Sequence, residues 1–147
     1  MADYYLDSFV GVADGTKFPP DRADGRKVGA KQSSIFGAKV AAQALANGDR
    51  LFLGRLRAGD ILRNIIVISD TTLGTTTLSI GPAGTPAKYA NARTMTVVDT
   101  PTSIGPRGTA AVLAPLTVDE DIWATLGVGG IAGGINLSIE LEICSVK

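Results

Sequence analysis

The acidic run Asp119-Glu120-Asp121 is the densest group of side chains in this sequence that could do chemistry. Carboxylate oxygens are the ligands that hard cations such as Ca²⁺ prefer. The run lacks the DxDxDG spacing of a Ca²⁺-binding loop, as do the Asp-Gly steps near residues 14–25. We therefore predict no metal site. Turn chemistry accounts for the Asp-Gly steps, and the acidic run is interpreted as a solvated loop that leads into the strand containing Trp123.

The glycine-rich stretch GVGGIAGG, residues 127–134, invites comparison with a phosphate-binding loop. Such a loop follows a strand, opens a helix, and usually carries a lysine followed by serine or threonine. Here a strand-like pattern follows the glycines and the stretch contains no lysine. The pattern favours a flexible hairpin connection and no cofactor.

Nucleophilic side chains are present, but their usual activating partner is not. The chain contains no histidine, so Ser33 and Ser34 cannot belong to a Ser-His-Asp triad. Lys31 is close to them in sequence, yet this proximity does not make a preorganised base. Cys144 is the single cysteine, which excludes an intrachain disulfide and predicts a buried, inert thiol. We predict that the chain is not an enzyme.

The overall charge balance argues against two classes of partner. Fourteen basic and fourteen acidic residues give a formal net charge of zero, without a basic stripe for nucleic-acid phosphates. The same balance gives no attraction to an anionic membrane, and no apolar run approaches the roughly 18 residues of a spanning helix. The first residues lack a basic region followed by an apolar one, so no signal peptide is expected. Synthesis in a host cytoplasm follows as an expectation.

Arg55 and Arg57 lie where a predicted strand enters the RAGD corner. One interpretation pairs them with nearby acidic groups such as Asp49 and Asp60, in cross-strand or corner ion pairs of about 0–1 kcal/mol. The alternative is contact with an acidic neighbouring subunit. The sequence favours neither.

The elements that would position these residues are strands. Turn signals at 46–49 and 58–60 separate residues 51–56, where leucines face one side and Phe52 the other, from the β-branched run 61–68. That run predicts a strand buried on both faces, whereas strict alternation over 135–143 predicts a half-buried strand. Residues 36–44 are predicted as strand rather than helix because an Asn-Gly turn follows. Further strands are expected at 75–80, 94–98, 109–113 and 121–126. The fold class is therefore all-β, a jelly-roll-like sandwich with an aliphatic core.

Residues 1–34 differ from the body, residues 35–147, and are predicted to form an extended N-terminal arm. They mix charges with glycine and proline and show no period of 2 or 3.6. Large apolar side chains in such a segment suggest anchors that dock on another surface. The predicted anchors are Tyr4, Tyr5, Leu6, Phe9 and Phe18.

The ordered series ALANGDRLFLGRLRAGDILRNIIVISDTTLG, TTTLSIG and DIWATLGVGGIAGGINLSIELEI resembles head decoration, or cement, proteins of tailed bacteriophages. These have a β-sandwich or jelly-roll body, and the resemblance covers roughly residues 36–147. It implies a virion protein on the outer surface of a capsid that clamps adjacent subunits. The implied partners are the major capsid protein and other copies of the chain, with a trimer favoured.

A mean hydropathy of +0.22 agrees with apolar surface that partners cover. The alternative function is a carbohydrate- or receptor-binding sandwich of a phage tail or other surface structure. Such sites present aromatic faces, and in the body only Trp123 and Tyr89 qualify, both of which are also candidates for the core.

Overall fold

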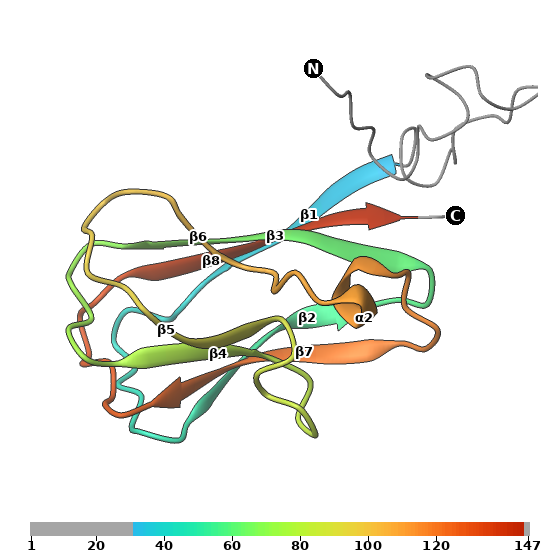
Figure 1. The fold of residues 1–147 in the computed structure, drawn as a ribbon. Helices are drawn as coiled ribbons and strands as arrows, with labels where there is room; N and C mark the ends of the chain where they lie inside the picture. Colours follow the sequence, from blue (N-terminus) through green and yellow to red (C-terminus); the bar gives the residue numbers. More distant parts are fainter. Residues whose placement is uncertain (1–30, 146–147) are drawn as a thin grey trace, which may run out of the picture.

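The described part of the chain folds into two four-stranded antiparallel sheets packed face to face. The computed structural model describes residues 31–145 (Figure 1). Its elements are β1 (Lys31–Ala38), β2 (Arg50–Leu56), β3 (Asp60–Ser69), β4 (Thr77–Gly81), β5 (Ala90–Thr94), β6 (Thr102–Gly105), α2 (Ala110–Leu113), β7 (Glu120–Gly127) and β8 (Leu137–Ser145).

The strand order is that of a jelly roll. One sheet has the order β1-β8-β3-β6 and the other the order β2-β7-β4-β5. The chain crosses from sheet to sheet at almost every connection, and only β4 and β5 follow one another within a sheet. Figure 1 shows the two layers, with β1, β8, β3 and β6 above β2, β7, β4 and β5. The predicted all-β, jelly-roll-like sandwich is confirmed.

The first and last described strands are neighbours. β1 pairs with β8 in antiparallel register from Lys31 opposite Ser145 to Ala38 opposite Ser138. β8 also pairs along its other side with β3. β8 is thus a central strand, whereas β1 lies at the edge of its sheet and pairs, among the described strands, with β8 alone.

The space between the sheets is filled mainly by aliphatic side chains, as the low aromatic content predicts. Along β8 the inward residues are buried, and they alternate with half-buried outward ones. Tyr89 is the one aromatic side chain in the described core. The largest fully buried side chains are Tyr89, Leu56, Leu62, Ile65, Leu78, Ile80, Met95, Ile122, Ile131, Leu137, Leu141 and Val67.

The strand predicted over 61–68 forms as β3, but it is not buried on both faces. Its burial alternates, with Leu62, Ile65 and Val67 in the core and Ile66 and Ile68 half-buried on the outer face. A β-bulge between Leu62 and Asn64 resets this alternation. The β-branched run therefore reflects strand propensity on an outer face as well as burial.

Two differences from prediction occur around β1. The strand begins at Lys31, so residues 31–34, which the sequence analysis assigned to the arm, form its first half. The strand also ends at Ala38, and residues 39–44 turn instead of continuing it. Leu45 then pairs with Ile131 in an isolated bridge, which anchors this turn to the connection between β7 and β8.

Two further predicted strands are wrong in position or type. The strand expected at 94–98 lies earlier, as β5, since residues 90–94 pair with β4. Residues 109–113 were expected to be extended, but Ala110–Leu113 forms the short helix α2. Its one buried residue, Val112, packs into the core, and alanines on a single turn tolerate that geometry.

Candidate interaction surfaces

The three carboxylates of the acidic run at the start of β7 accept from four different residues, namely Ala58, Lys88, Tyr89 and Arg55. Asp119 accepts a hydrogen bond from the Ala58 backbone N–H at 2.9 Å. Glu120 forms an ion pair with Lys88 and accepts a hydrogen bond from the Tyr89 hydroxyl at 2.7 Å. Because these partners point the carboxylates in different directions, the run closes corners of the sandwich rather than surrounding one cation. Within residues 31–145, no group of three or more metal-ligating side chains is assembled.

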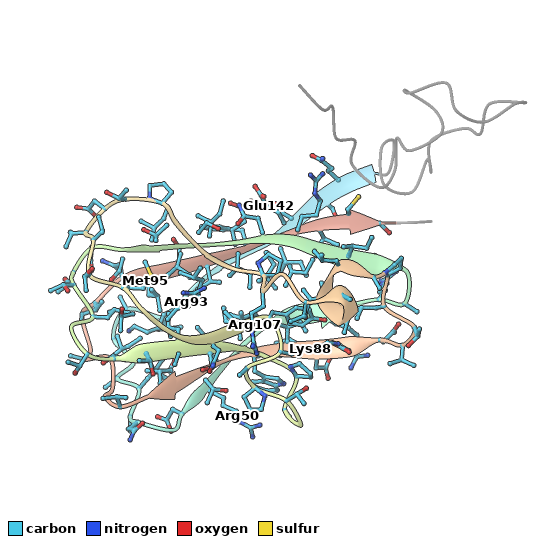
Figure 2. The ribbon with its side chains drawn as sticks, viewed as in Figure 1. Arg50, Lys88, Arg93, Met95, Arg107 and Glu142 are labelled. Atoms are coloured by element: carbon cyan, nitrogen blue, oxygen red, sulfur yellow. The ribbon has the colours of Figure 1, made fainter. Side chains whose placement is uncertain are left out.

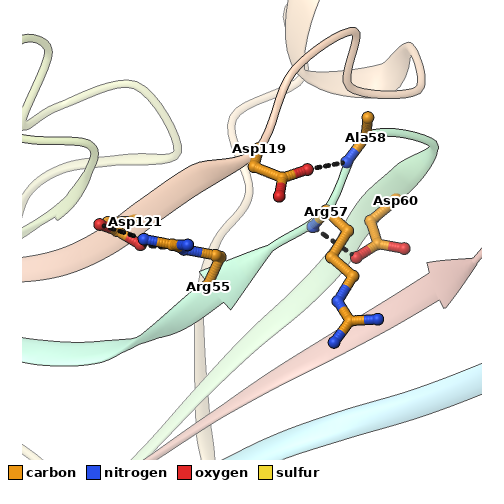
Figure 3. A network of polar contacts seen from close by, with 6 residues as sticks. All are labelled: Arg55, Arg57, Ala58, Asp60, Asp119 and Asp121. Atoms are coloured by element: carbon orange, nitrogen blue, oxygen red, sulfur yellow. Dashed lines mark hydrogen bonds and ion pairs between the residues drawn. The ribbon is translucent and has the colours of Figure 1, made fainter.

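Arg55 forms an ion pair with a residue that its position in the sequence does not suggest. It lies directly opposite Asp121 across β2 and β7, and its Nε and Nη2 donate to the two carboxylate oxygens at 2.6 and 3.1 Å (Figure 3). The hydrogen bond and charge of Asp121 raise the pKa of Arg55, and Arg55 lowers the pKa of Asp121. The cross-strand interpretation holds for Arg55, with Asp121 as partner instead of Asp49 or Asp60.

Arg57 behaves differently from Arg55. Its backbone N–H donates to Asp60 Oδ2 at 2.8 Å, which closes the corner before β3. Asp60 N–H in turn donates to the Arg57 carbonyl at 2.9 Å. Figure 3 shows the Arg57 guanidinium directed away from Asp119 and Asp121. Of the two arginines, Arg57 is therefore the one whose side-chain charge remains for another molecule, within the described part of the chain.

A small cluster on the outer face of the second sheet joins two aromatic rings and a guanidinium. Phe52 and Trp123 are direct partners across β2 and β7, and their ring centroids are 5.0 Å apart at an interplanar angle of 59°. The Arg50 guanidinium carbon lies 5.4 Å from the centroid of the Trp123 ring. Phe52 is 51% exposed, and Trp123 is half-buried. We call Arg50, Phe52 and Trp123 the aromatic patch.

On the β4 side of Trp123, the aromatic patch has a glycine as its neighbour. Gly81 on β4 lies opposite Trp123. A Cβ at Gly81 would come within 2.2 Å of the Thr85 carbonyl oxygen, so the connection that follows β4 folds back over this position. Arg50 extends from the lower side of the molecule in Figure 2, away from the first sheet.

A polar groove of about 620 Å³ opens on the outer face of the first sheet. Glu140 and Glu142 project into it from β8 because their neighbours Ile139, Leu141 and Ile143 face the core. Glu142 is labelled beside β1 in Figure 2. The described residues that line the groove are Gln32, Ser33, Ser34, Arg63, Asn64, Glu140, Glu142 and Ile143.

The remaining sequence candidates have structural roles or lie outside the described residues. Cys144 is buried at 4% exposure, as predicted. The glycine-rich stretch connects β7 to β8, but these strands belong to different sheets, so it crosses between the sheets and the predicted hairpin is wrong. Ser33 and Ser34 are exposed on β1. Within residues 31–145, no helix is long and apolar enough to cross a membrane. The predicted anchors lie outside the described residues: Tyr4, Tyr5, Leu6, Phe9 and Phe18.

Sequence reasoning did not assemble the aromatic patch. It placed Phe52 on the face opposite the neighbouring leucines, and it considered Trp123 either for the core or for a sugar site. Phe52 and Trp123 become neighbours through the pairing register of β2 with β7, which includes a bulge between Phe52 and Gly54. Tyr89, the other sugar-site candidate, is 1% exposed and belongs to the core.

Comparison with known proteins supports a fold found in phage capsids. No protein-family model matches the chain, and no curated protein matches it. A chain of the cyanophage Pam1 capsid asymmetric unit is similar in structure, with a TM-score of 0.58 and 19% identity over 79% of this chain and 84% of that one. A chain of the capsid of Ralstonia phage GP4 has a TM-score of 0.55 and 19% identity over 80% and 86%. The jelly-roll sandwich described here is thus a fold that also occurs in chains of two phage capsids.

Proposed function

We propose that the chain is a structural protein of a phage virion that binds the outer surface of the capsid and clamps adjacent capsid subunits, as a decoration or cement protein does. The observation that carries this proposal is the likeness of the sandwich to chains of two phage capsids, over 79% and 80% of its length. The likeness covers the body, and the clamping role is our extension of it. The major capsid protein is the proposed partner, together with neighbouring copies of the chain in a homo-oligomer, with a trimer favoured.

The use of polar groups in the body supports a structural role. The carboxylates of Asp119, Glu120 and Asp121 all bind donors on neighbouring strands or corners. They therefore stabilise the sandwich rather than face a substrate. This supports a module that presents surface, and neither nucleic acid nor a membrane is among the proposed partners.

The proposed contact residues fall into two groups. The arm anchors are those named above, and in the body Arg57 is the stronger candidate. Asp121 already neutralises Arg55, whereas the charge of Arg57 remains for an acidic neighbour. We therefore expect Arg57→Gln to weaken capsid binding more than Arg55→Gln does.

The first test is the copy number of the chain in purified particles, measured by mass spectrometry against the major capsid protein. A number comparable with that of the capsid protein supports a decoration role. A handful of copies indicates the tail or neck, and complete absence overturns the proposal.

The second test removes the arm, and the structure determines where to cut. A deletion of residues 1–34 would remove half of β1, so the informative variant lacks residues 1–30 and retains Lys31–Ala38. Binding is measured by co-sedimentation with capsids that lack the chain. The circular dichroism spectrum checks that the sheets remain. Strong loss of binding with an unchanged β spectrum supports the arm as the clamp, and undiminished binding overturns it.

A second candidate function is carbohydrate or receptor binding, and the aromatic patch is the observation that favours it. Trp123 offers a partly exposed ring with Arg50 beside it, a combination that sugar sites use. A glycan array decides this question. Binding that disappears in a folded Trp123→Ala variant would favour this function, and an array without signal would dismiss it.

A further inference from the structure

The aromatic patch has the composition of a protein-docking site. Tryptophan and arginine dominate the binding energy of protein interfaces, and rings that stack beside a guanidinium present a large, rigid contact area. Tyr89 is the one aromatic side chain among the buried hydrophobic residues of the described chain, so the core itself does not use the rings of Phe52 and Trp123. Phe52 instead leaves 51% of its surface exposed.

The charge of the patch indicates what kind of segment it would hold. Arg50 has no carboxylate partner within residues 31–145, and its guanidinium lies over the Trp123 ring. Arg55, on the same face, is already paired with Asp121. A complementary segment would place a carboxylate near Arg50 and apolar or aromatic side chains against Phe52 and Trp123.

One stretch of this chain outside the described residues has that composition. Residues 3–9, DYYLDSF, combine Asp3 and Asp7 with Tyr4, Tyr5 and Phe9. Residues 1–16 contain three aspartates and neither lysine nor arginine, so this end of the chain is acidic and aromatic while the patch is basic and aromatic.

The connecting chain is long enough to reach the patch. Residues 10–30 separate the acidic aromatic stretch from Lys31, where β1 begins. Fully extended, they span roughly 70 Å, and as a flexible coil about 25 Å on average. The two sheets of a sandwich lie only about 10 Å apart, so the path around one edge to the outer face of the second sheet is within this range.

We propose that residues 3–9 dock on the aromatic patch of their own chain, with Asp3 or Asp7 near Arg50 and the tyrosines and Phe9 against Phe52 and Trp123. The docked segment covers its own aromatic side chains in the absence of other molecules. This inference goes beyond the proposed function and does not rest on it.

Trp123 is the single tryptophan of the chain, so its fluorescence reports directly on the patch in the full-length protein. The test measures acrylamide quenching in a variant with Tyr4→Ser, Tyr5→Ser and Phe9→Ser. The matched control is Phe18→Ser, which changes an aromatic residue of the same predicted arm outside the docking stretch. All four substitutions lie outside the described sandwich, and circular dichroism checks that it is retained.

We expect the quenching constant of Trp123 to rise by about twofold in the triple variant, with a red shift of emission, because a covering apolar group is lost. The control should leave both unchanged. The double variant Asp3→Asn, Asp7→Asn should show part of this rise in the quenching constant, because the attraction to Arg50 is lost. Added salt should raise the quenching constant of the unaltered chain in the same way, because it screens that attraction.

Two results would overturn the proposal. Equal quenching in the triple variant and the unaltered chain would mean that these residues do not cover the patch. Protection that disappears on dilution would show that a second copy supplies the segment. The quenching measurement uses isolated protein without capsids. A negative result would therefore overturn the docking proposal and would leave the proposed capsid binding to be decided by its own tests.

Discussion

The side-chain ammonium of Lys39 lies 2.6 Å from the backbone carbonyl oxygen of Gln43. It also donates to the carbonyls of Val40 and Ala41 at 3.0 and 3.2 Å, and Lys39 as a whole is only 3% exposed. The chain that leaves β1 therefore wraps around one buried cation. The Val40 and Ala41 carbonyls also accept from the backbone N–H groups of Gln43 and Gly134, whereas the Gln43 carbonyl has the ammonium as its donor. This contact explains why residues 39–44 turn instead of extending the strand.

Replacing Lys39 by methionine should destabilise the fold by about 1–3 kcal/mol, because the Gln43 carbonyl loses its ammonium donor while the aliphatic stem is kept. Denaturant unfolding measures the change. Arg63→Met is the matched control, since Arg63 is exposed on β3. Equal stability of the two variants would show that water replaces the ammonium without cost.

The Arg55–Asp121 pair should make stability depend on pH in the acid range. The Arg55 hydrogen bond and charge hold the pKa of Asp121 below its ordinary value of 3.8. A lowered pKa in the folded state means that the pair contributes fully above pH 3.8, and that this contribution disappears as pH falls through the lowered value. The stability difference between the unaltered chain and Arg55→Gln should therefore shrink on acidification.

The same pair allows a direct measurement. The Asp121 carboxyl should titrate by NMR below its ordinary pKa in the unaltered chain and closer to it in Arg55→Gln. Because both side chains are largely exposed, 61% and 42%, added salt should reduce the difference. Identical titration in the two proteins would refute the interaction in solution.

Tyr89 should make stability depend on pH at the alkaline end. Burial and the neighbouring Glu120 carboxylate raise the pKa of its hydroxyl above the ordinary 10.0. A raised pKa in the folded state gives stability that is complete below pH 10 and is lost as pH rises towards the folded value. Absorbance of tyrosinate at alkaline pH should show one of the three tyrosines ionising later than the others.

Removing the Tyr89 hydroxyl tests the hydrogen bond itself. Tyr89→Phe keeps the buried ring but leaves Glu120 with Lys88 alone, so about 1.5–3 kcal/mol of stability should be lost at neutral pH. The difference from the unaltered chain should narrow above pH 10. A constant difference across that range would contradict the raised pKa.

Gly81 and Gly84 provide a pair of substitutions with opposite expected outcomes. A Cβ at Gly81 would lie 2.2 Å from the Thr85 carbonyl oxygen, whereas a Cβ at Gly84 meets nothing within 4 Å. Gly81→Ala should therefore destabilise the fold by several kcal/mol and shift the emission of Trp123, which lies opposite it. Gly84→Ala should be nearly neutral in thermal unfolding. A neutral Gly81→Ala would show that the connection after β4 moves freely.

The strands with clear periodicity could be predicted from the sequence, and those without it could not. β8 alternates strictly, and a half-buried strand needs no other information. Residues 109–113 carry no such pattern, and the burial of Val112 in the helical turn depends on contacts with the core that local sequence does not reveal. Residues 39–44 depend on the Lys39 ammonium, and its contacts with carbonyls become visible only in three dimensions.

The surface contacts were harder to predict because register decides them. Asp121 lies 66 residues after Arg55, and nothing local identifies it as the partner in preference to Asp60. The aromatic patch likewise requires β2 and β7 to pair with their bulge in place. Sequence patterns predict which side of a strand a residue occupies, but they do not predict its neighbour across the sheet.

The pairing of β1 with β8 determines how the sandwich would resist a mechanical load applied through the chain before Lys31. Tension applied through the residues before Lys31, along the strand axis, loads the whole ladder from Lys31–Ser145 to Ala38–Ser138 in shear, so its hydrogen bonds share the force. Tension applied perpendicular to the strand in the plane of the sheet would open the same bonds one at a time, since β1 has no second neighbour among the strands of residues 31–145. The attachment of β1 to the sandwich should therefore resist a force along the strand axis better than a force perpendicular to it.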